Sequence, residues 1–402
     1  MLDEQLRPPL AYDPLDPATI EDPYPVLRAL REATPVFWHE GMQSWAVTRY
    51  DDCMTVLRDH ARFARDRRRV GQPLPPASMS VQSLDRPMQG VIRSMFTAAL
   101  RDQDLGLMEQ RARRALDLRL GELAGRGGFD VMCDLARPLA LMVIADLLGI
   151  DEPAVDSFEQ VSDMVMRSMD GRLDPSLAEA GIAARDQLTA LVGGWSASST
   201  RSGLLSHVTE HASRAGEAIG GIDAGLLIRN TSRVMFQGGY STVTAAIGNV
   251  VHALLEFPEV LEQVRDPRLL QTGVDELVRF DGPVQGTSRL AAEDCTVGGV
   301  AIRRGETVVT LLAAANRDPA QFAAPDELHL DRSPNQHLGY GWGTHSCLAT
   351  PAAQMALRSL LSALADFPAR LRATGPARRR RTATMRVFDV LPAALIPARS
   401  AA

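Results

Sequence analysis

The amino-acid sequence predicts a mainly α-helical protein with a minor β region. Apolar residues recur at helical spacing through most of residues 89–221, and a further helical segment follows over residues 223–257. Strand-like segments are short and fall around residues 36–48 and 285–315. With 402 residues, of which 45% are hydrophobic, the chain can bury a large core, and its length allows one large domain or several smaller ones.

The charge of the chain argues against one class of partner. All 43 basic residues are arginines, and 49 acidic residues outnumber them to give a formal charge of −6. The absence of lysine is typical of codon bias in a GC-rich genome rather than of anion binding. An acidic balance argues against a nucleic-acid-binding protein.

The sequence also gives expectations about location and cysteine chemistry. The N-terminal segment MLDEQLRPPLAYDPLDP is acidic and broken by prolines, which is typical of neither a signal peptide nor a membrane anchor. The longest apolar runs, such as residues 139–145, are far shorter than the ~20 residues of a spanning helix. We therefore expect a soluble, cytoplasmic protein that does not contact a membrane. Four scattered cysteines without CxxC spacing argue against a disulfide framework or a zinc site.

The first elements of the chain are a strand pair, a helix and a loop. Residues 36–48 predict two short strands around a turn at Glu40-Gly41, and a helix begins near Asp51. Residues 64–88 are rich in Arg, Pro and Ser and lack periodicity, which predicts a long surface loop. This loop carries arginines that either clamp an acidic substrate or carrier domain or form a solvated run: Arg65, Arg67, Arg68 and Arg69.

The middle of the chain is helical. Helices fill residues 89–221, with stops around residues 125–128 and 149–153. The segment 223–257 then predicts a helix that would cross about 50 Å at 1.5 Å per residue. Its centre carries Gly238, Gly239, Ser241 and Thr242, which have low helix propensity and can kink the helix or open its hydrogen-bond ladder.

The last third of the chain alternates short elements with loops. A helix after Pro267 ends in DELVRF, strand-like segments follow in residues 285–315, and residues 316–334 form a proline-punctuated meander. The meander leads into a glycine-rich loop, GYGWGTHSC, and a helix that begins near Leu348.

Cys347 lies where this glycine-rich loop gives way to the helix. Unpaired amides and the dipole at a helix N-terminus stabilise an anion, so we expect this thiol to ionise more easily than an isolated one. Gly339, Gly341 and Gly343 permit close backbone approach around it. The ordinary alternative is a buried cysteine behind a flexible loop.

Two motifs in this region resemble those of the cytochrome P-450 family of haem-thiolate monooxygenases. The family's haem-ligand loop runs Phe-Gly-x-Gly-x-His/Arg-x-Cys-x-Gly, and residues 340–349 read YGWGTHSCLA, with Tyr340 in place of Phe and Ala349 in place of Gly. The family's Glu-x-x-Arg falls at Glu276 and Arg279, 68 residues before Cys347. The resemblance extends over nearly the whole chain.

The resemblance implies the cytochrome P-450 fold as a single domain over residues 1–402, with haem b (iron protoporphyrin IX) between the long central helix and the cysteine loop. Cys347 is then the thiolate ligand of the iron, and thiolate donation favours cleavage of the O–O bond. Glu276 and Arg279 would lock the meander to the helix behind the haem, whereas the spacing alone reads as a surface ion pair.

The resemblance also implies residues that bind the haem. Arg289 and His345 match propionate donors, with a solvated loop histidine as the less favoured alternative for His345. A family His-x-x-x-Arg motif aligns with Gln89 and Arg93, where Gln89 can donate a hydrogen bond but carries no charge. Two further assignments to the cofactor site, Tyr340 and Gly239, come from the cysteine loop and the central helix.

The central helix departs from the family at one catalytic position. The family usually reads Ala-Gly-x-Glu/Asp-Thr, and this chain reads Gly238-Gly239-Tyr240-Ser241-Thr242. Thr242 keeps the alcohol that serves proton delivery to dioxygen. Ser241 replaces the acid, and a hydroxyl can order a water but cannot shuttle a proton through an ionised state near neutral pH.

Three interpretations of this change stay open. Another acid, a water chain or the substrate supplies the proton, and the enzyme carries out a hydroxylation or epoxidation, as in secondary metabolism and antibiotic biosynthesis. Alternatively the enzyme couples C–C, C–N or C–O bonds, or abstracts hydrogen, on an aromatic or amide substrate. The third interpretation is a non-catalytic haem-binding or recruiting protein.

The resemblance further implies the pocket and the partners. Family pocket segments contain apolar residues that predict an adaptable apolar pocket, or simply core: Met79, Met88, Met164, Met166, Met169 and Phe388. Besides the small-molecule substrate and O2, the expected partners are a ferredoxin and its reductase, which carry electrons from NAD(P)H, with a carrier protein as a further candidate. Arginines on the cysteine-loop face would meet the acidic ferredoxin. We expect no fused reductase, because the sequence continues only 55 residues beyond Cys347.

Overall fold

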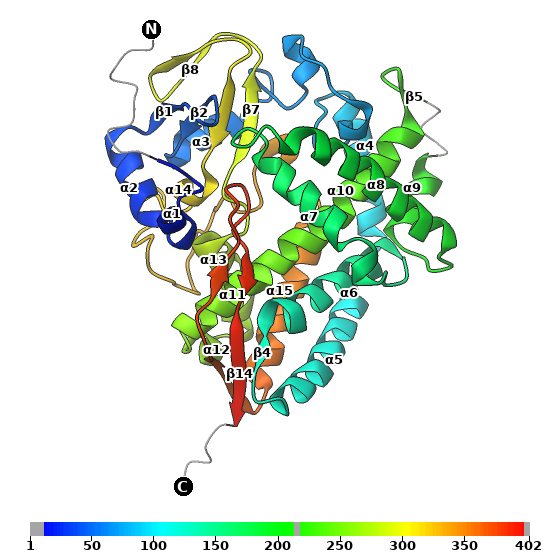
Figure 1. Cartoon of the computed structure of the whole chain (residues 1–402), viewed down its shortest axis with the longest axis vertical. Helices are drawn as coiled ribbons and strands as arrows, with labels where there is room; N and C mark the ends of the chain where they lie inside the picture. The colour runs from blue at the N-terminus through cyan, green and yellow to red at the C-terminus, as the bar shows by residue number, and fades with distance from the viewer. Residues whose placement is uncertain (1–11, 213–217, 398–402) are drawn as a thin grey trace.

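The computed structural model of the chain describes residues 12–212 and 218–397, so the first part of the acidic N-terminal segment lies outside the described residues. Helices form the larger part of these ranges and small sheets the rest, as predicted (Figure 1). No helix within the described ranges is both long enough and apolar enough to cross a membrane.

Most helices follow the predicted order, with boundaries that differ from the predictions by a few residues, but no prediction covered the two helices before residue 35 or the short helix Leu312–Ala315. The helices are α1 Pro17–Glu21, α2 Tyr24–Ala33, α3 Tyr50–Arg58, α4 Met88–Arg101, α5 Leu105–Ala124, α6 Arg137–Leu148, α7 Glu159–Arg167, α8 Leu177–Ser198, α9 Leu204–Ala212, α10 Ala224–Gln237, α11 Val243–Glu256, α12 Val260–Gln263, α13 Pro267–Asp281, α14 Leu312–Ala315 and α15 Thr350–Asp366.

The strands are short and lie in several places: those within residues 36–47 and 287–297 are at the upper left of Figure 1, Ala218–Ile219 is at the upper right, and Pro392–Pro397 runs down toward the C-terminal end. They are β1 Val36–His39, β2 Ser44–Val47, β3 Phe63–Ala64, β4 Phe129–Asp130, β5 Ala218–Ile219, β6 Ile222–Asp223, β7 Thr287–Ala291, β8 Cys295–Val297, β9 Val300–Ile302, β10 Thr307–Thr310, β11 Ala369–Ala373, β12 Arg378–Arg379, β13 Phe388–Val390 and β14 Pro392–Pro397.

The largest sheet has the order β1-β2-β10-β7-β3 and combines the strand pair near the N-terminus with strands from residues 287–310. β1 and β2 are antiparallel, as the turn at Glu40-Gly41 predicts, and Val308 of β10 lies opposite Trp45 on one side and Arg289 on the other. This register places Arg289 on an inner strand, where it is buried.

The long central helix is present and is interrupted where its composition predicts. Asp223 caps α10 by accepting hydrogen bonds from the N–H groups of Gly225 (2.9 Å) and Leu226 (3.2 Å). Between α10 and α11, Gly238–Thr242 form one π-helical turn, so the chain continues in one direction while its ladder widens. The low helix propensity of these residues therefore produces a local opening rather than an end to the helix.

The predicted surface loop over residues 64–88 is more ordered and more buried than expected. It contains the 3-10 turns Arg67–Val70 and Pro76–Ser78, and Leu84 and Asp85 are buried. Its arginines form a solvated run only in part: Arg67 and Arg69 are exposed, but Arg68 pairs with Asp66 (2.6 Å) and Arg69 with Asp85 (3.2 Å). These ion pairs brace the segment internally, and Arg65 connects it to the sheet by donating to the Ser288 carbonyl.

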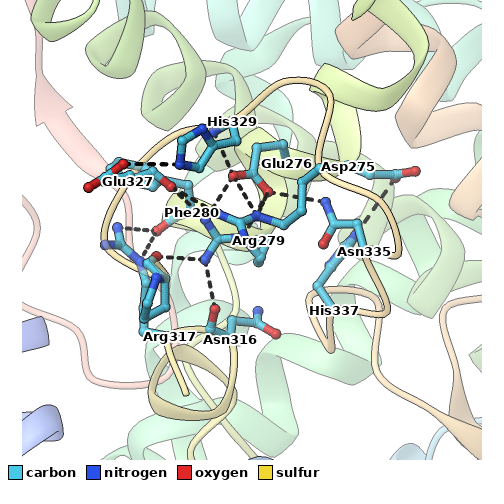
Figure 2. A network of polar contacts seen from close by, with 12 residues as sticks. Asp275, Glu276, Arg279, Phe280, Asn316, Arg317, Glu327, His329, Asn335 and His337 are labelled. Atoms are coloured by element: carbon cyan, nitrogen blue, oxygen red, sulfur yellow. Dashed lines mark hydrogen bonds and ion pairs between the residues drawn. The ribbon is translucent and has the colours of Figure 1, made fainter. Parts of the chain in front are cut away.

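A buried ion-pair network ties α13 to the meander that precedes the cysteine loop (Figure 2). Glu276 is 0% exposed, and its carboxylate accepts hydrogen bonds from Nε and Nη2 of Arg279 (both 2.8 Å) and from the N–H of His329 (2.9 Å). Arg279 donates further to backbone carbonyls of the meander: Asn316 (2.9 Å), Pro325 (2.8 Å) and Glu327 (3.0 Å). The pair is therefore a buried structural lock and not a surface ion pair.

Candidate functional site

The loop before α15 folds back so that Cys347 is held by its own neighbours. The Cys347 N–H donates to the carbonyl of Tyr340 (2.7 Å), and Gly341 and Gly343 adopt φ angles of 66° and 72° that favour glycine. A Cβ on Gly343 would lie 2.7 Å from the Leu57 carbonyl oxygen. The glycines are therefore required by a tight turn and by close contact with α3.

The Cys347 side chain is solvent-accessible, but much of the surrounding chain lies close to the sulfur. Burial raises the pKa of its thiol, although the Thr350 hydroxyl, the Ala349 N–H and Arg93 act in the opposite direction. The expectation that the Cys347 thiol ionises easily is therefore wrong for the protein chain without haem. The helix begins at Thr350, and the Ala349 N–H just before it offsets only part of the effect of burial on the pKa of Cys347.

Gln89 and Arg93 are one turn apart on α4 and both hold the cysteine loop. Gln89 Nε2 donates to the carbonyl of Thr344 (2.7 Å), and Arg93 donates to the Ser346 carbonyl (3.0 Å) and to Ser346 Oγ (3.1 Å). The structure therefore places both residues identified by the motif alignment in contact with the cysteine loop.

His345 is buried rather than solvated, and it contacts an acid that the sequence analysis did not identify. Its Nε2 lies 3.2 Å from Asp85 Oδ1, and because a carboxylate only accepts, we assign the proton to Nε2. Burial lowers the pKa of His345 to about 4, so the imidazole is neutral at pH 7. Burial alone would raise the pKa of Asp85, but hydrogen bonds from His345 and from the Arg65 and Asp66 N–H groups outweigh it and lower that pKa to about 2.

Two arginines beside His345 lack a matching carboxylate. Arg289 is 4% exposed and donates only to the Ser288 carbonyl (2.9 Å) and Thr287 Oγ1 (3.2 Å), and burial, followed by repulsion from Arg65, lowers its pKa to about 9. Arg65 donates to the Ser288 carbonyl (3.2 Å), while its buried Nε has no partner among the described residues.

These observations test whether the chain could hold a haem. Arg65 and Arg289 lie near His345 together with Asp85, and Arg93 lies near Cys347 on the same loop. Buried guanidinium groups with orphaned N–H atoms are suited to bidentate binding of carboxylates, such as the two propionates of a porphyrin. The accessible thiol of Cys347 supplies a soft ligand nearby, so the donor set fits haem.

The predicted distal residues lie in the π-helical turn. The Thr242 hydroxyl donates to the Gly238 carbonyl, and Ser241 Oγ accepts from Gln237 Nε2 (2.7 Å) and lies 3.4 Å from Ser162 Oγ. Gln237 Nε2 also donates to the Ser162 carbonyl (3.1 Å). Ser241 therefore sits in an uncharged network between the central helix and α7.

Gly239 packs against another helix, in contrast to the prediction that it lies at the cofactor site. A Cβ on Gly239 would lie 2.3 Å from Ile144 Cδ1, so this glycine lets α6 cross the central helix closely. Gly238, Ser241 and Thr242 line the cavity instead. The motif identified the right turn of helix, but it could not show which glycine faces the site.

A cavity of about 650 Å³ opens from this turn toward β7 and the segment around residues 379–387. Met166 and Met169 line it, whereas Met79, Met88, Met164 and Phe388 are not among its lining residues. Phe388 is instead buried under Arg379, whose guanidinium carbon lies 3.9 Å from its ring. The larger part of the lining is apolar, as predicted, but several arginines also line the cavity, which the prediction did not include.

Tyr340 shapes the cysteine loop through its backbone. Its carbonyl accepts the Cys347 N–H, while its ring packs 5.5 Å from that of His337. Its buried hydroxyl has no partner among the described residues, and burial raises its pKa. The side chain therefore takes the place of a phenylalanine in an apolar setting.

Comparisons with known proteins agree with this geometry. The family model described as Cytochrome P450 matches residues 226–367. The Mycinamicin IV hydroxylase/epoxidase of Micromonospora griseorubida is 31% identical over 335 residues, which are 81% of this chain and 82% of that protein. The structure of CalO2 superposes with a TM-score of 0.84 at 29% identity and covers 96% of this chain and 99% of its own. That of P450BioI in complex with hexadec-9Z-enoic acid ligated acyl carrier protein superposes with a TM-score of 0.79 at 26% identity, covering 94% of this chain and 100% of P450BioI. With these matches, the chain belongs to the cytochrome P450 family of monooxygenases.

Proposed function

We propose that this P450 hydroxylates or epoxidises a small organic molecule as a tailoring step of secondary metabolism. The observation that carries the proposal is that Arg93 bonds the Cys347 loop, while Arg65 and Arg289, which have no ion pair within the described residues, lie near His345 of the same loop. The mycinamicin relative, named a hydroxylase/epoxidase, supports the reaction type.

The chain's own residues would hold haem b from two sides. Cys347 Sγ would bind the iron, and Arg65, Arg93, Arg289 and His345 would bind the propionates. Gln89 would keep the loop in place through the Thr344 carbonyl rather than bind haem itself. When bound, haem supplies the activation of dioxygen that inserts one oxygen atom into a substrate.

Thr242 and Ser241 would serve proton delivery without an acid. The Thr242 hydroxyl, which donates to the Gly238 carbonyl, can turn to donate toward the cavity. Ser241 and Ser162 each offer a hydroxyl that can order a water, and Gln237 holds Ser241 Oγ in position. Since none of these groups ionises near neutral pH, protons would have to pass between waters that they orient.

The partners follow from the same proposal. Electrons would come from NAD(P)H through a ferredoxin and its reductase, and arginines near the cysteine loop would contact the acidic ferredoxin. The solved complex of P450BioI with acyl carrier protein makes a carrier-bound substrate a further possibility to test. The cytoplasmic location and the single domain over residues 1–402 stay predictions.

The proposal is tested with the haem-loaded protein and a surrogate ferredoxin pair. Reduced protein under carbon monoxide should show the red-shifted Soret band of thiolate-ligated haem, and Cys347→Ser should abolish that band. Turnover of a substrate panel should give products that are heavier by one oxygen atom from dioxygen. Coupled products without added oxygen, or no turnover across the panel, would overturn the proposal.

A further inference from the structure

The cavity beside the central helix carries an excess of uncompensated positive charge. Asp170 is the single acidic residue among its described lining residues, and its carboxylate accepts from the N–H groups of Ala383 and Thr384 (both 2.9 Å). Three lining arginines are neutralised by ion pairs, namely Arg379, Arg380 and Arg386. Of the other lining arginines, Arg65 is assigned to the haem propionates, and the rest have no ion pair within the described part of the chain: Arg67, Arg172, Arg185 and Arg233.

Arg233 is the most unusual of these residues. It lies on α10, is 4% exposed, and its Nε is buried without a hydrogen-bond partner in the described ranges. Its one hydrogen bond runs from Nη2 to the Ala77 carbonyl at 3.4 Å. Burial lowers the pKa of Arg233 to about 10, with repulsion from Arg185 adding to the effect, yet the group stays charged at pH 7.

Arg185 strengthens the same positive region. It lies on α8 and donates to Ser168 Oγ (2.9 Å), and burial lowers its pKa. Asp186 attracts Arg233 only at longer range, because the two form no ion pair. A buried cation without a partner costs several kcal/mol, and such a site persists where a ligand supplies the missing charge.

The position of Arg233 relates this charge to the reacting end of the cavity. Arg233, Gln237 and Ser241 follow at intervals of four residues, so they share one face of the helix, and all three line the cavity. Thr242 is nine positions from Arg233, which is about 13 Å along the helix axis. If Arg233 binds the charged group of a ligand, that group therefore lies well away from the ligand carbon atom beside Thr242.

We infer that the substrate carries a carboxylate, which Arg233 binds with help from Arg185 at the end of the cavity away from Thr242. This inference rests on the proposed function and names the substrate class of the same site. The planar guanidinium offers two directed donors that match a carboxylate, and the cavity holds only one competing acid. The rest of the substrate lies along Val165, Met166 and Met169.

Calorimetric titration of the haem-loaded protein tests the inference without any electron donor. The probes are dodecanoic acid and 6-phenylhexanoic acid, each compared with its methyl ester. We expect at least one acid to bind about ten- to hundred-fold more tightly than its ester, and Arg233→Met to remove that preference, since one charge-assisted hydrogen-bonded contact is lost. Arg233→Lys should keep part of the preference for the acid, because lysine keeps the positive charge but lacks the two directed donors of the guanidinium group.

Two further variants and a spectrum make the result decisive. Arg185→Met should weaken the preference by a smaller factor, and Arg67→Gln, which changes an exposed lining arginine bonded to Gln72, should leave it unchanged within about two-fold. The carbon monoxide spectrum confirms that each variant is folded and loaded. If neither acid outbinds its ester, or if the preference survives in Arg233→Met, the inference is overturned. Oxidation of esters and acids alike would then leave the proposed monooxygenase function intact.

Discussion

Replacing Glu276 by Gln tests whether the network of Figure 2 is the lock that the structure describes. The substitution keeps the volume of the side chain and removes its charge. Besides Arg279, the carboxylate accepts from Arg332 Nε (3.0 Å) and Asn335 Nδ2 (3.1 Å), so the variant leaves two guanidinium groups without their anion. Removing one partner of a buried ion pair costs about 3–5 kcal/mol, against a total stability of about 5–15 kcal/mol.

The chain contains a matched control for this experiment. Glu262 and Arg265 form an ion pair with the same i,i+3 spacing, but their side chains are 69% and 51% exposed. Exposed pairs contribute about 0–1 kcal/mol, so Glu262→Gln should change little. Asn335→Ala, which removes one donor to Glu276, should fall between the two at about 1 kcal/mol.

Urea titrations of the haem-loaded variants, followed by circular dichroism and by the carbon monoxide spectrum, measure the effect. Glu276→Gln should shift the midpoint of unfolding strongly and lower the fraction of protein with the thiolate-type band, because the meander leads directly into the cysteine loop. Should Glu276→Gln unfold at the same urea concentration as Glu262→Gln, the reasoning from burial would be refuted. If it fails to fold at all, the order of Asn335→Ala and Glu262→Gln still decides the matter.

Four other substitutions have expected outcomes. Thr242→Ala should raise peroxide release per NAD(P)H consumed, and unchanged coupling in a reconstituted assay would contradict its role in proton delivery. The pKa of Asp281 is lowered to about 2, because Arg386 and Arg379 outweigh the effect of burial, so its stabilisation is complete above about pH 4 and is lost as the pH falls toward 2. Asp281→Asn should therefore flatten acid unfolding measured by circular dichroism, and an unchanged acid profile would count against this. Gly239→Ala should lower stability by about 1–3 kcal/mol through the contact with Ile144, while Gly238→Ala, whose Cβ meets no atom within 4 Å, should not, and equal melting temperatures would refute that difference.

Features carried by local sequence were predictable. The Cys347 loop and the Glu276–Arg279 pair are short motifs with fixed spacing, so they could be recognised although several of their contacts are made with distant residues. The π-helical turn was foreseen as an opening in the central helix because Gly238 and its neighbours have low helix propensity.

Features that depend on distant partners were not predictable. Asp85 contacts His345 although the two residues are 260 positions apart in the sequence. The local sequence shows only that Asp85 is an acidic residue in an arginine-rich loop. Counting arginines could not show that Arg379 is neutralised by Asp281 while Arg233 is not. The spacing of Arg233, Gln237 and Ser241 along one helix face was the available signal for the cavity charge. The roles of Gly238 and Gly239 depend on the rotation of the helix, which composition does not reveal.

An arginine-lined cavity also has a constant charge over the physiological pH range. Arg233, with a pKa of about 10, stays protonated there, and the described lining residues include no histidine to titrate near neutrality. Carboxylic acids are fully ionised in this range, so the affinity for a carboxylate ligand should stay constant between about pH 6 and 8. At lower pH the affinity should fall as the ligand itself becomes protonated.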